Sequence, residues 1–401
     1  MNILYLDWPC FGADSILYMW ERRGYSVVKF SHEDYSQRVS DGFDEAVDCV
    51  IEAGVCDGAA AHGFDLTFSY NYFPLMARAC KRHNIPYVSL VYDSPQVKLY
   101  SYTVTYPTNY IFHFDSAEVA RFRKEGISNF YYMPLPVNAE LTQELMKMPY
   151  DKEKFSSDLS FVGTLYNEEH NLLDRFDGIS GYTRGYLNAV MDAQSKVYGA
   201  AFMEETLTPE VVQDLQSQAQ YKNNSDGVET LPYIFADYFL ARKLTATERA
   251  RFLGSIAERF GADYDLKLYT RNVDAVIGDG KGMRNMGPAS YYDEMPYIFH
   301  NSRINLNISL RSIKNGIPLR CMDIMGAGGF LLTNYQADML EHFVPDEDFV
   351  YYESEEDMLR KIEYYLTHEE ERARIAANGY EKVRENHSFE LVWDQMISVV
   401  F

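Results

Sequence analysis

Residues 303–333 read RINLNISLRSIKNGIPLRCMDIMGAGGFLLT, and this stretch decides the fold. Ile304–Ser309 alternates apolar residues with Asn or Ser, and Phe330–Thr333 is a continuous apolar run, so both segments are predicted strands. Between them we expect a loop and then a short helix over Met322–Met325 that Gly326 ends. This order of strand, loop, helix and buried strand is typical of an α/β protein with a parallel sheet.

This stretch is rich in basic residues, and its predicted loop carries Arg311, Lys314 and Arg320. Arg303, Arg311, Lys314 and Arg320 all precede the first acidic residue of the stretch, Asp323, although the whole chain has a formal net charge of −22. A cationic loop at the carboxyl end of a strand, next to a helix start, is where α/β proteins bind phosphate. One helical turn beyond Arg320, Asp323 could accept hydrogen bonds from ribose hydroxyls. The pattern favours a nucleotide site, and a solvated basic loop is the alternative.

The length and composition of the chain narrow its class. A chain of 401 residues exceeds one typical core, so two domains are expected. The composition, 47% hydrophobic and 24% charged, is that of a folded globular protein. An excess of 59 Asp and Glu over 37 Lys and Arg argues against nucleic acid or anionic lipid as the general partner. A phosphate ligand therefore has to be met by a local basic patch.

Cysteine, histidine and hydropathy patterns exclude several other classes. The five cysteines contain no CxxC pair, which favours free thiols in a reducing compartment. The nine histidines never fall at the spacing of a paired ligand motif, so we expect no metal site. No signal peptide and no run of roughly 18 apolar residues is apparent, so no integral membrane segment is expected. The sequence predicts a cytoplasmic protein that needs no cofactor.

Strand and helix patterns alternate through the first part of the chain, 1–150. Strands recurring every 20 to 40 residues with helices between them indicate βαβ units and a parallel sheet covered on both faces. This segment is therefore predicted to be a Rossmann-like domain. Its predicted strands are Asn2–Asp7, Tyr25–Phe30, Leu66–Tyr70, Tyr87–Tyr92, Tyr110–Phe114 and Phe130–Met133.

The second part, 151–385, begins in the same way. A predicted strand at Asp158–Val162 ends in a Gly turn, and a helix is expected from about Glu168. Residues from about 185 to 260 have helical patterns with a polar interruption at Tyr221–Gly227, which predicts a helical elaboration of this domain. The sheet is expected to resume at Leu266–Tyr269 and Phe349–Tyr352. The architecture predicted is α/β, with two doubly wound domains facing a cleft.

Two clusters in the first domain follow predicted strands directly. Asp93 comes after the strand Tyr87–Tyr92, and His113 lies at the end of Tyr110–Phe114. The carboxyl ends of the strands line the crevice of an open α/β sheet, so either residue could act as a general base or stabilise positive charge on a sugar ring. An Asx turn before Pro95 is the alternative for Asp93, and a buried structural histidine is the alternative for His113.

Glycine turns give weaker signals. Gly163-Thr164 follows the first strand of the second domain, where a lone Gly lets a diphosphate approach backbone N–H groups. Gly278–Gly282, GDGKG, resembles a phosphate loop but lacks a following Ser or Thr and a helix, so we interpret it as a surface loop. No GxSxG motif that would mark a serine hydrolase is present.

Two stretches together resemble a known family. NISLRSIKNGIPLRCMDIMGAGGFLLTNY, beginning at Asn307, and FVYYESEEDMLRKIEYYLTHEEERARIAANGYEKVRENHSF, beginning at Phe349, are similar to the glycosyltransferase-like family of spore-maturation proteins. LVYDSPQ and FHFDS in the first half look like the domain often found ahead of it. The resemblance implies a GT-B fold of two Rossmann-like domains: the nucleotide sugar binds the C-terminal domain and the acceptor mainly the N-terminal one. The last helix, 386–401, would cross back to the N-terminal domain.

The resemblance also assigns residues. Asp323 would be the second acid of the E-x7-E motif and hold the donor ribose, while Asn315 stands where the first Glu is expected. Arg311 and Lys314 would neutralise the diphosphate leaving group, and the segment 291–296 would pack on the base. Tyr92 stands where many relatives carry a histidine. The predicted donor-site residues are Gly163, Thr164, Tyr291, Tyr292, Arg311, Lys314, Asn315, Gly316, Arg320 and Asp323.

The function expected is glycosyl transfer from a nucleoside-diphosphate sugar to an unknown glycan, protein or small-molecule acceptor. A UDP-sugar is the expected donor, and the resemblance implies a retaining, metal-independent reaction. Two alternatives stay open. A nucleotide-sugar epimerase would use a similar fold but needs acid and base groups around the sugar. A non-catalytic carbohydrate-binding or assembly protein is consistent with Asn315 and Tyr92.

Overall fold

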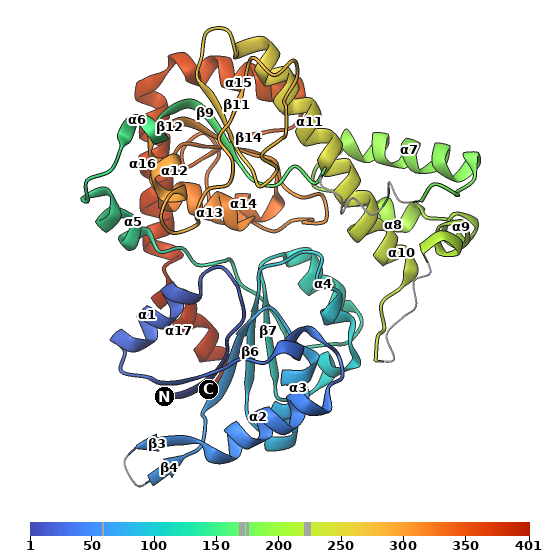
Figure 1. The fold of residues 1–401 in the computed structure, drawn as a ribbon, viewed down its shortest axis with the longest axis vertical. Coiled ribbons are helices and arrows are strands. Elements are labelled where there is room, and N and C mark those ends of the chain that lie inside the picture. The colour runs from blue at the N-terminus through green and yellow to red at the C-terminus, as the bar shows by residue number, and fades with distance from the viewer. Residues whose placement is uncertain (58–59, 168–172, 174–175, 220–225) are drawn as a thin grey trace. The chain divides into compact units, whose positions relative to one another are not determined.

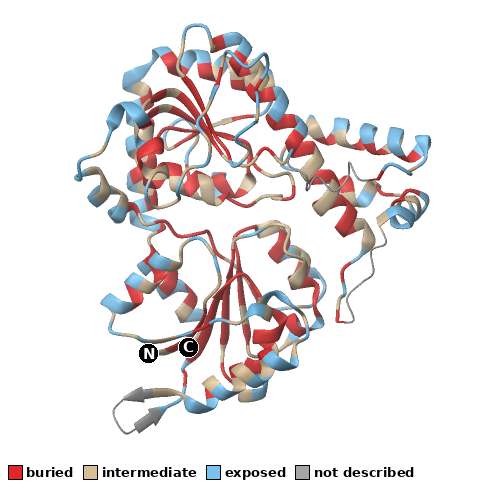
Figure 2. Cartoon of the chain, viewed as in Figure 1, coloured by how far each residue is buried: buried red, intermediate tan, exposed pale blue. Residues whose placement is uncertain are grey.

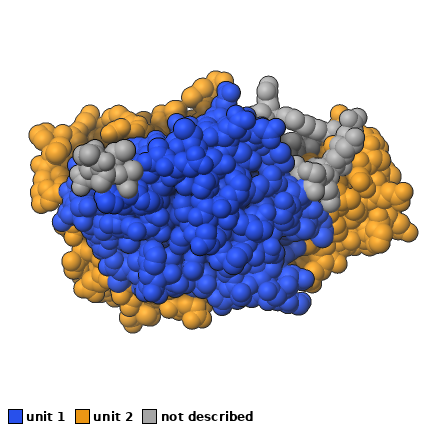
Figure 3. Space-filling model, turned by 90° about the horizontal axis from the view of Figure 1, so that it is seen from below, with its two compact units in different colours: residues 1–135, 222–230, 389–401 blue, residues 136–221, 231–388 orange. Residues whose placement is uncertain are grey.

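The chain forms two compact α/β units, each with its own parallel sheet. The computed structural model describes residues 1–401 except 58–59, 168–172, 174–175 and 220–225. Unit 1 comprises residues 1–135, 222–230 and 389–401, and unit 2 comprises 136–221 and 231–388 (Figure 3). Each unit contains a six-stranded sheet whose central strands are buried between helices (Figures 1 and 2). The predicted fold class, α/β with two doubly wound sheets, is confirmed.

The sheet of unit 1 has the strand order β2-β1-β5-β6-β7-β8, and all its strand pairs are parallel. The central strands are buried along their whole length, which agrees with their mainly apolar and aromatic sequences. The strands predicted for the first half are all present, within two residues of the predicted bounds. They are β1 (Asn2–Leu6), β2 (Ser26–Phe30), β5 (Leu66–Tyr70), β6 (Tyr87–Val91), β7 (Asn109–His113) and β8 (Phe130–Tyr132).

Helices cover this sheet, and the C-terminal helix α17 belongs to the same unit. Trp20 of α1 and Trp393 of α17 pack edge to face with ring centroids 5.0 Å apart. A short antiparallel pair, β3 (Val55–Asp57) and β4 (Ala60–His62), follows α2. The helices of unit 1 are α1 (Ala13–Arg22), α2 (Asp41–Ala53), α3 (Pro74–His83), α4 (Ser116–Lys124) and α17 (Phe389–Val400), with short turns of helix η1 (Glu33–Ser36), η2 (Val97–Tyr100) and η3 (Tyr102–Thr105).

A short segment from the helical middle of the chain also belongs to unit 1. Asp226 pairs with Arg38 at 3.3 Å and Arg78 at 3.7 Å and accepts a hydrogen bond from the Ser101 hydroxyl at 2.7 Å. Glu229 lies 3.6 Å from Arg38, and both acidic side chains are buried. Buried charges are stable only when paired and hydrogen-bonded, so these contacts fix the segment firmly. The predicted interruption at 221–227 lies mostly outside the described residues.

The sheet of unit 2 has the strand order β11-β10-β9-β12-β13-β14, and every pair is parallel. This is the order 3-2-1-4-5-6 of the Rossmann fold when its strands are counted along the chain. The strands are β9 (Ser157–Val162), β10 (Leu266–Tyr269), β11 (Arg284–Asn285), β12 (Ser302–Asn307), β13 (Leu331–Asn334) and β14 (Val350–Tyr352). The strands predicted here are confirmed, and the two-residue β11 was not predicted.

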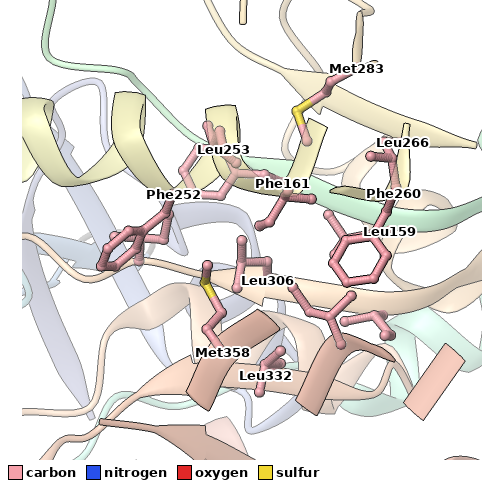
Figure 4. Packing of buried hydrophobic residues seen from close by; sticks show 14 of the residues in the cluster. Leu159, Phe161, Phe252, Leu253, Phe260, Leu266, Met283, Leu306, Leu332 and Met358 are labelled. Atoms are coloured by element: carbon pink, nitrogen blue, oxygen red, sulfur yellow. The ribbon is translucent and has the colours of Figure 1, made fainter. Parts of the chain in front are cut away.

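Apolar clusters lie on both faces of this sheet. On one face, Phe252, Leu253 and Phe260 of α11 pack over β9 and β12, as Figure 4 shows. On the other, α12, α13 and α14 pack on residues such as Leu331. The helices of unit 2 are α5 (Ala139–Met146), α6 (Lys152–Phe155), α7 (Gly181–Ser195), α8 (Met203–Thr206), α9 (Pro209–Ala219), α10 (Leu231–Tyr233), η5 (Ile234–Leu240, a π-helix), α11 (Ala241–Phe260), α12 (Met295–Asn301), α13 (Leu319–Gly326), α14 (Ala337–His342), α15 (Glu355–Thr367) and α16 (Glu369–Asn386).

Two sequence predictions need comment here. Helix α13 begins at Leu319, three residues before the predicted start, because Pro318 takes the N-cap position, where a missing N–H costs nothing. Arg320 therefore lies in the first turn of the helix and not in the loop. The helix predicted from about Glu168 lies outside the described residues. In the part of the chain that is described, none of the helices combines the length and apolar character of a membrane-spanning segment.

Two histidines, His342 and His387, lie close together where the first and last segments of unit 2 pair with each other. The carbonyl of His387 accepts a hydrogen bond from Val137 N at 2.9 Å, and Val137 and Ser388 form a parallel bridge. The buried His387 ring lies 5.2 Å from the ring of His342. Burial, together with the charges of His342 and Lys382, lowers the pKa of His387 to about 4. The folded protein therefore holds this ring neutral.

This depressed pKa predicts a loss of stability in acid. Between about pH 6.5 and pH 4 the unfolded chain binds a proton at His387 that the folded chain does not, so the free energy of unfolding falls as the pH falls. From pH 7 to pH 5 we expect this group to lower the free energy of unfolding of the wild type by about 2 kcal/mol, and His387→Gln should not show this decrease. Urea unfolding at each pH measures the free energy. His368→Gln, at an exposed histidine of the same unit, is the control. Equal pH profiles for wild type and His387→Gln would contradict the assignment.

Candidate active site

The strand order of unit 2 reverses direction between β9 and β12. In open α/β sheets, ligands bind at this switch point, beyond the carboxyl ends of the two strands. Gly163-Thr164 follows β9, and the basic loop 308–318 follows β12, so the sequence-predicted segments meet there. Gly163 N donates to the Tyr269 carbonyl at 3.0 Å and extends the pairing of β9 with β10.

Arg249 of α11 occupies the switch point itself. Its guanidinium donates one hydrogen bond to the Thr164 carbonyl and one to the Ile308 carbonyl, so it joins the ends of β9 and β12. The ring of Tyr166 lies 4.9 Å below the guanidinium. A Cβ at position 163 would lie 3.3 Å from the Phe161 ring and 3.5 Å from Arg249 Nη1, so Gly163 leaves room for these side chains to pack closely.

Arg249 is a buried cation without an acidic partner among the residues that the structure describes. It is 7% exposed, its Nε has no hydrogen-bond partner there, and no described carboxylate lies within ion-pair distance. Burial lowers its pKa, and the positive charge of Arg320 adds to this effect. An uncompensated guanidinium at a switch point is suited to bind an anion.

Each of the three cations that the sequence predicted for this site faces a carboxylate. Arg311 forms a two-pronged pair with Glu248, Nε to Oε2 at 2.8 Å and Nη2 to Oε1 at 2.6 Å. Its guanidinium also stacks 3.9 Å from the ring of Tyr198 and donates to the carbonyls of Ser195 and Val197. Glu248 raises the pKa of Arg311 against the opposing effect of burial. The charge of Arg311 is thus balanced within the fold, and its predicted contact with a diphosphate stays a prediction.

Lys314 pairs with the π-helix that precedes α11. Its Nζ lies 3.4 Å from Asp237 Oδ2, and Asp237 is only 6% exposed. A π-helix is rare and is found mostly near functional sites, where its widened turn places side chains that an α-helix would not. The neighbouring loop residue Asn315 contributes its carbonyl, which accepts from Asp338 N at 3.0 Å, and Gly316 is buried.

Arg320 and Asp323 lie one turn apart on α13, as the sequence predicted. Arg320 Nη1 is 3.3 Å from Asp323 Oδ2, and Tyr291 donates its hydroxyl to Asp323 Oδ1 at 2.8 Å. Tyr291 and Tyr292 pack edge to face with ring centroids 4.9 Å apart. The aromatic pair and the carboxylate therefore lie together, and their contacts with a base and a ribose stay predictions.

Burial raises the pKa of Asp323 to about 6, and the Arg320 charge and the Tyr291 hydrogen bond oppose this effect. The ionised carboxylate accepts ribose hydroxyls and the protonated one does so less well. If Asp323 binds a donor ribose, affinity for UDP-glucose falls about tenfold from pH 7 to pH 5, following the ionised fraction of a group with a pKa near 6. Titration calorimetry of wild type and Asp323→Asn measures this. UDP-glucose suits the test because its diphosphate diester does not titrate there, and a pH-independent affinity in wild type would remove Asp323 from the site.

The predicted catalytic residues lie in unit 1. Asp93 is exposed and follows β6, and Asn71 holds it: Asn71 Nδ2 donates to Asp93 Oδ2 at 2.6 Å, and Asn71 Oδ1 accepts from Asp93 N at 3.3 Å. His113 is 1% exposed, and its Nδ1 accepts from Asp115 N at 3.0 Å. His113 thus organises the turn into α4, and its catalytic role stays a prediction.

Sequence reasoning missed Arg249, although the sequence carried a signal. The buried stripe of α11 includes Thr245, Phe252, Leu253 and Ile256. Arg249 lies within this stripe, because it follows Thr245 by four residues and precedes Phe252 by three. A charged residue in an apolar stripe is rarely buried without a function or a partner. The prediction of a generic helical elaboration over about 185–260 obscured it. In the described residues no group of three His, Cys, Asp or Glu side chains is placed to hold a metal ion.

Comparisons with known protein families show one match. Residues 242–398 match the family model described as "Glycosyl transferase-like", and this segment contains Arg249, Arg311 and Asp323. No curated protein sequence matches the chain.

Several solved structures share its fold over nearly the full length. Alr3699/HepE from Anabaena, solved in complex with UDP and glucose, is 12% identical with a TM-score of 0.53, covering 100% of this chain and 99% of that chain. Sucrose-phosphate synthase from Thermosynechococcus elongatus is 11% identical with a TM-score of 0.51, covering 100% and 98%. A UDP-forming α,α-trehalose-phosphate synthase from Burkholderia vietnamiensis is 12% identical with a TM-score of 0.52, covering 99% and 98%.

Residues 242–398 therefore carry a glycosyl transferase-like domain, within a chain whose two sheets make it an α/β protein. More particularly, its two parallel six-stranded sheets match the GT-B architecture of the solved glycosyltransferases. At these identities the structural likeness shows the fold alone. The predicted enzyme class and fold are therefore confirmed.

Proposed function

We propose that the protein transfers a sugar from a nucleoside-diphosphate sugar, specifically a UDP-sugar, to an acceptor that is a glycan, a protein or a small molecule. The observation that carries this proposal is Arg249, a buried cation without a described acidic partner at the switch point of unit 2. Arg311, Lys314 and Arg320 surround the same sheet edge, and the complexes of Alr3699/HepE with UDP and with UDP-glucose support UDP as the nucleotide.

The proposed chemistry assigns each group a role. The bond between the sugar C1 and the diphosphate breaks, a bond from C1 to the acceptor oxygen forms, and the acceptor proton passes to a base. Arg249 stabilises the charge that develops on the diphosphate, and preorganised donors of this kind are usually the largest catalytic contribution. Asp323 and Tyr291 hold the ribose and the base. Gly163 and Thr164 give the diphosphate access to the backbone.

The finer features of the reaction rest on the resemblance. We propose a retaining and metal-independent transferase of the spore-maturation type that works in the cytoplasm. The free thiols of Cys10, Cys80 and Cys321 are consistent with a reducing compartment. A product whose anomeric configuration, read by NMR, matches the donor supports retention, and an unchanged rate in EDTA supports metal independence.

Asp93 and His113 stay the proposed catalytic residues of unit 1. The exposed carboxylate of Asp93, fixed by Asn71, is the better placed of the two to meet a substrate. Asp93→Asn should lower kcat and leave UDP binding unchanged. A loss of activity with His113→Asn that tracks a loss of folded protein would assign His113 a structural role only.

The direct test of the proposed function is a thermal-shift screen with UDP, GDP, CDP, ADP and dTDP. A ligand that binds only the folded state raises the free energy of unfolding by mass action, and the melting temperature rises with it. The gain is about 2.7 kcal/mol when the ligand is present at a hundred times its dissociation constant. We expect UDP to give the largest shift and Asp323→Ala to abolish it. No shift with any of the five nucleotides would reject the proposal.

The alternatives give different results in one further assay. A transferase often hydrolyses its donor slowly when no acceptor is present, whereas a non-catalytic binding protein does not. An epimerase would convert the UDP-sugar without releasing UDP. Release of UDP and free sugar from a UDP-sugar panel, abolished in Arg249→Gln, would therefore favour the transferase over both alternatives.

A further inference from the structure

Unit 1 has a switch point of its own, between β1 and β5, and aromatic side chains line it. Trp8, directly after β1, donates its indole N–H to the Tyr70 carbonyl at the end of β5, at 2.9 Å. Trp8 is stacked on Tyr92, with ring centroids 6.3 Å apart and an interplanar angle of 6°, and on Tyr35, at 5.9 Å and 25°. Half-buried rings with polar tips at a switch point form a surface suited to a sugar.

Lys98 lies against this aromatic cluster without a polar partner. Its Nζ is 4.5 Å from the ring centroid of Phe73 and 5.8 Å from that of Tyr35. Its side chain is half-buried, and among the residues that the structure describes none accepts a hydrogen bond from it or pairs with it. The two rings attract the ammonium, but they replace only part of its hydration.

The charges around Lys98 do not balance it either. Burial first, and then the charge of Arg38, lower the pKa of Lys98 to about 8, and Asp93 opposes both effects. Arg38 is itself paired with Asp226 and Glu229, whereas the Asp93 carboxylate is held by Asn71. In a chain with a net charge of −22, a half-buried lysine that pairs with no described acid is unusual.

We propose that Lys98 binds an anionic group of the acceptor, so that the acceptor is an acidic sugar that carries a carboxylate or a phosphate. The inference rests on the proposed function, because it places the acceptor site at the switch point of unit 1. Tyr35 and Tyr92 supply aromatic surface for the sugar ring, and Asp93 accepts hydrogen bonds from its hydroxyls.

The test compares three probes: glucose, glucuronate and glucose 6-phosphate. Their dissociation constants for the full chain are measured by saturation-transfer NMR in wild type and in Lys98→Met. At least one of the two anions should bind wild type more tightly than glucose and lose at least about tenfold in affinity in Lys98→Met, while glucose binding does not change. Comparing glucuronate with glucose 6-phosphate then identifies whether the acceptor carries a carboxylate or a phosphate.

Lys81→Met is the matched control. Lys81 makes the same kind of contact, with Nζ 3.9 Å from the Tyr106 ring, but it is exposed in the last turn of α3, which leads back to the opposite edge of the sheet. This variant should bind every probe as wild type does. If neither anion binds wild type more tightly than glucose, or if both lysine variants lose the same affinity, the proposal is rejected.

A second readout follows from the proton on Lys98. Near pH 8 part of the Lys98 population is neutral, so an anion that pairs with the ammonium causes proton uptake. The binding heat of the tighter anion should therefore vary with the ionisation enthalpy of the buffer in wild type and not in Lys98→Met. The UDP thermal shift is also recorded in wild type and in Lys98→Met. Its absence in wild type would reject the proposed function, whereas the anion affinities test the role of Lys98 separately.

Discussion

Replacing Arg311 by methionine is expected to lower the free energy of unfolding by about 3–5 kcal/mol. The guanidinium holds Glu248 through two hydrogen bonds, and Glu248 is 2% exposed, so the substitution leaves a buried carboxylate without its counter-charge. The double variant Arg311→Met/Glu248→Met should recover most of the loss, because it removes both charges from the interior. Urea unfolding of the single and double variants measures both effects.

The control for this experiment is an ion pair in solvent. Arg259 and Glu363 are paired at 2.5 Å on the surface of unit 2, with side chains 46% and 62% exposed, and Arg259→Met should cost less than about 1 kcal/mol. A loss of under about 1 kcal/mol for Arg311→Met would contradict the structural role of the pair. UDP titration of the double variant then isolates binding: an unchanged affinity would show that Arg311 does not contact the diphosphate, and a loss of about 1.5–3 kcal/mol would show that it does.

Replacing Arg249 by glutamine should weaken UDP binding by about 1.5–3 kcal/mol, or roughly 10- to 150-fold. Stability should change much less, because two opposing effects meet at this residue. Glutamine loses hydrogen bonds to the carbonyls of Thr164 and Ile308, but it also removes a charge that burial disfavours. Calorimetric titration with UDP gives the affinity, and thermal unfolding without ligand gives the stability.

Arg251→Gln is the matched control on the same helix. Arg251 is paired with Glu355 at 2.9 Å and is 47% exposed, so its loss should affect neither UDP affinity nor stability strongly. Equal UDP affinities of wild type and Arg249→Gln would remove Arg249 from the donor site. A collapse in stability with Arg249→Gln alone would instead assign the residue a structural role.

The sheets could be predicted from the sequence because their strands are buried on both faces. Leu66–Tyr70 and Leu266–Tyr269 are short segments of mainly apolar and aromatic residues, and both are buried strands with the predicted bounds. The start of α13 could not be placed as well, because the predicted helix followed the apolar residues from Met322, whereas Pro318 sets the first turn.

The site was predicted only where its contacts are local in sequence. Arg320 and Asp323 are one helical turn apart, so their proximity follows from helix geometry. The partner of Arg311 is 63 residues away in the chain, and no pattern in the loop indicates that a buried glutamate neutralises it. The basic loop suggested several phosphate-binding cations, whereas two of its cations face carboxylates from η5 and α11. Tertiary pairing, not composition, decides which cation is left for a ligand.

The most direct test of the central claim, that unit 2 binds the donor nucleotide at its switch point, is photolabelling of the full chain with 5-azido-UDP-glucose. Peptide mass spectrometry then locates the label. We expect labelled peptides from the segments around Tyr291 and Asp323, where the base and ribose would lie, and excess UDP should prevent the labelling. Labelling confined to unit 1, or labelling that UDP does not reduce, would contradict the account.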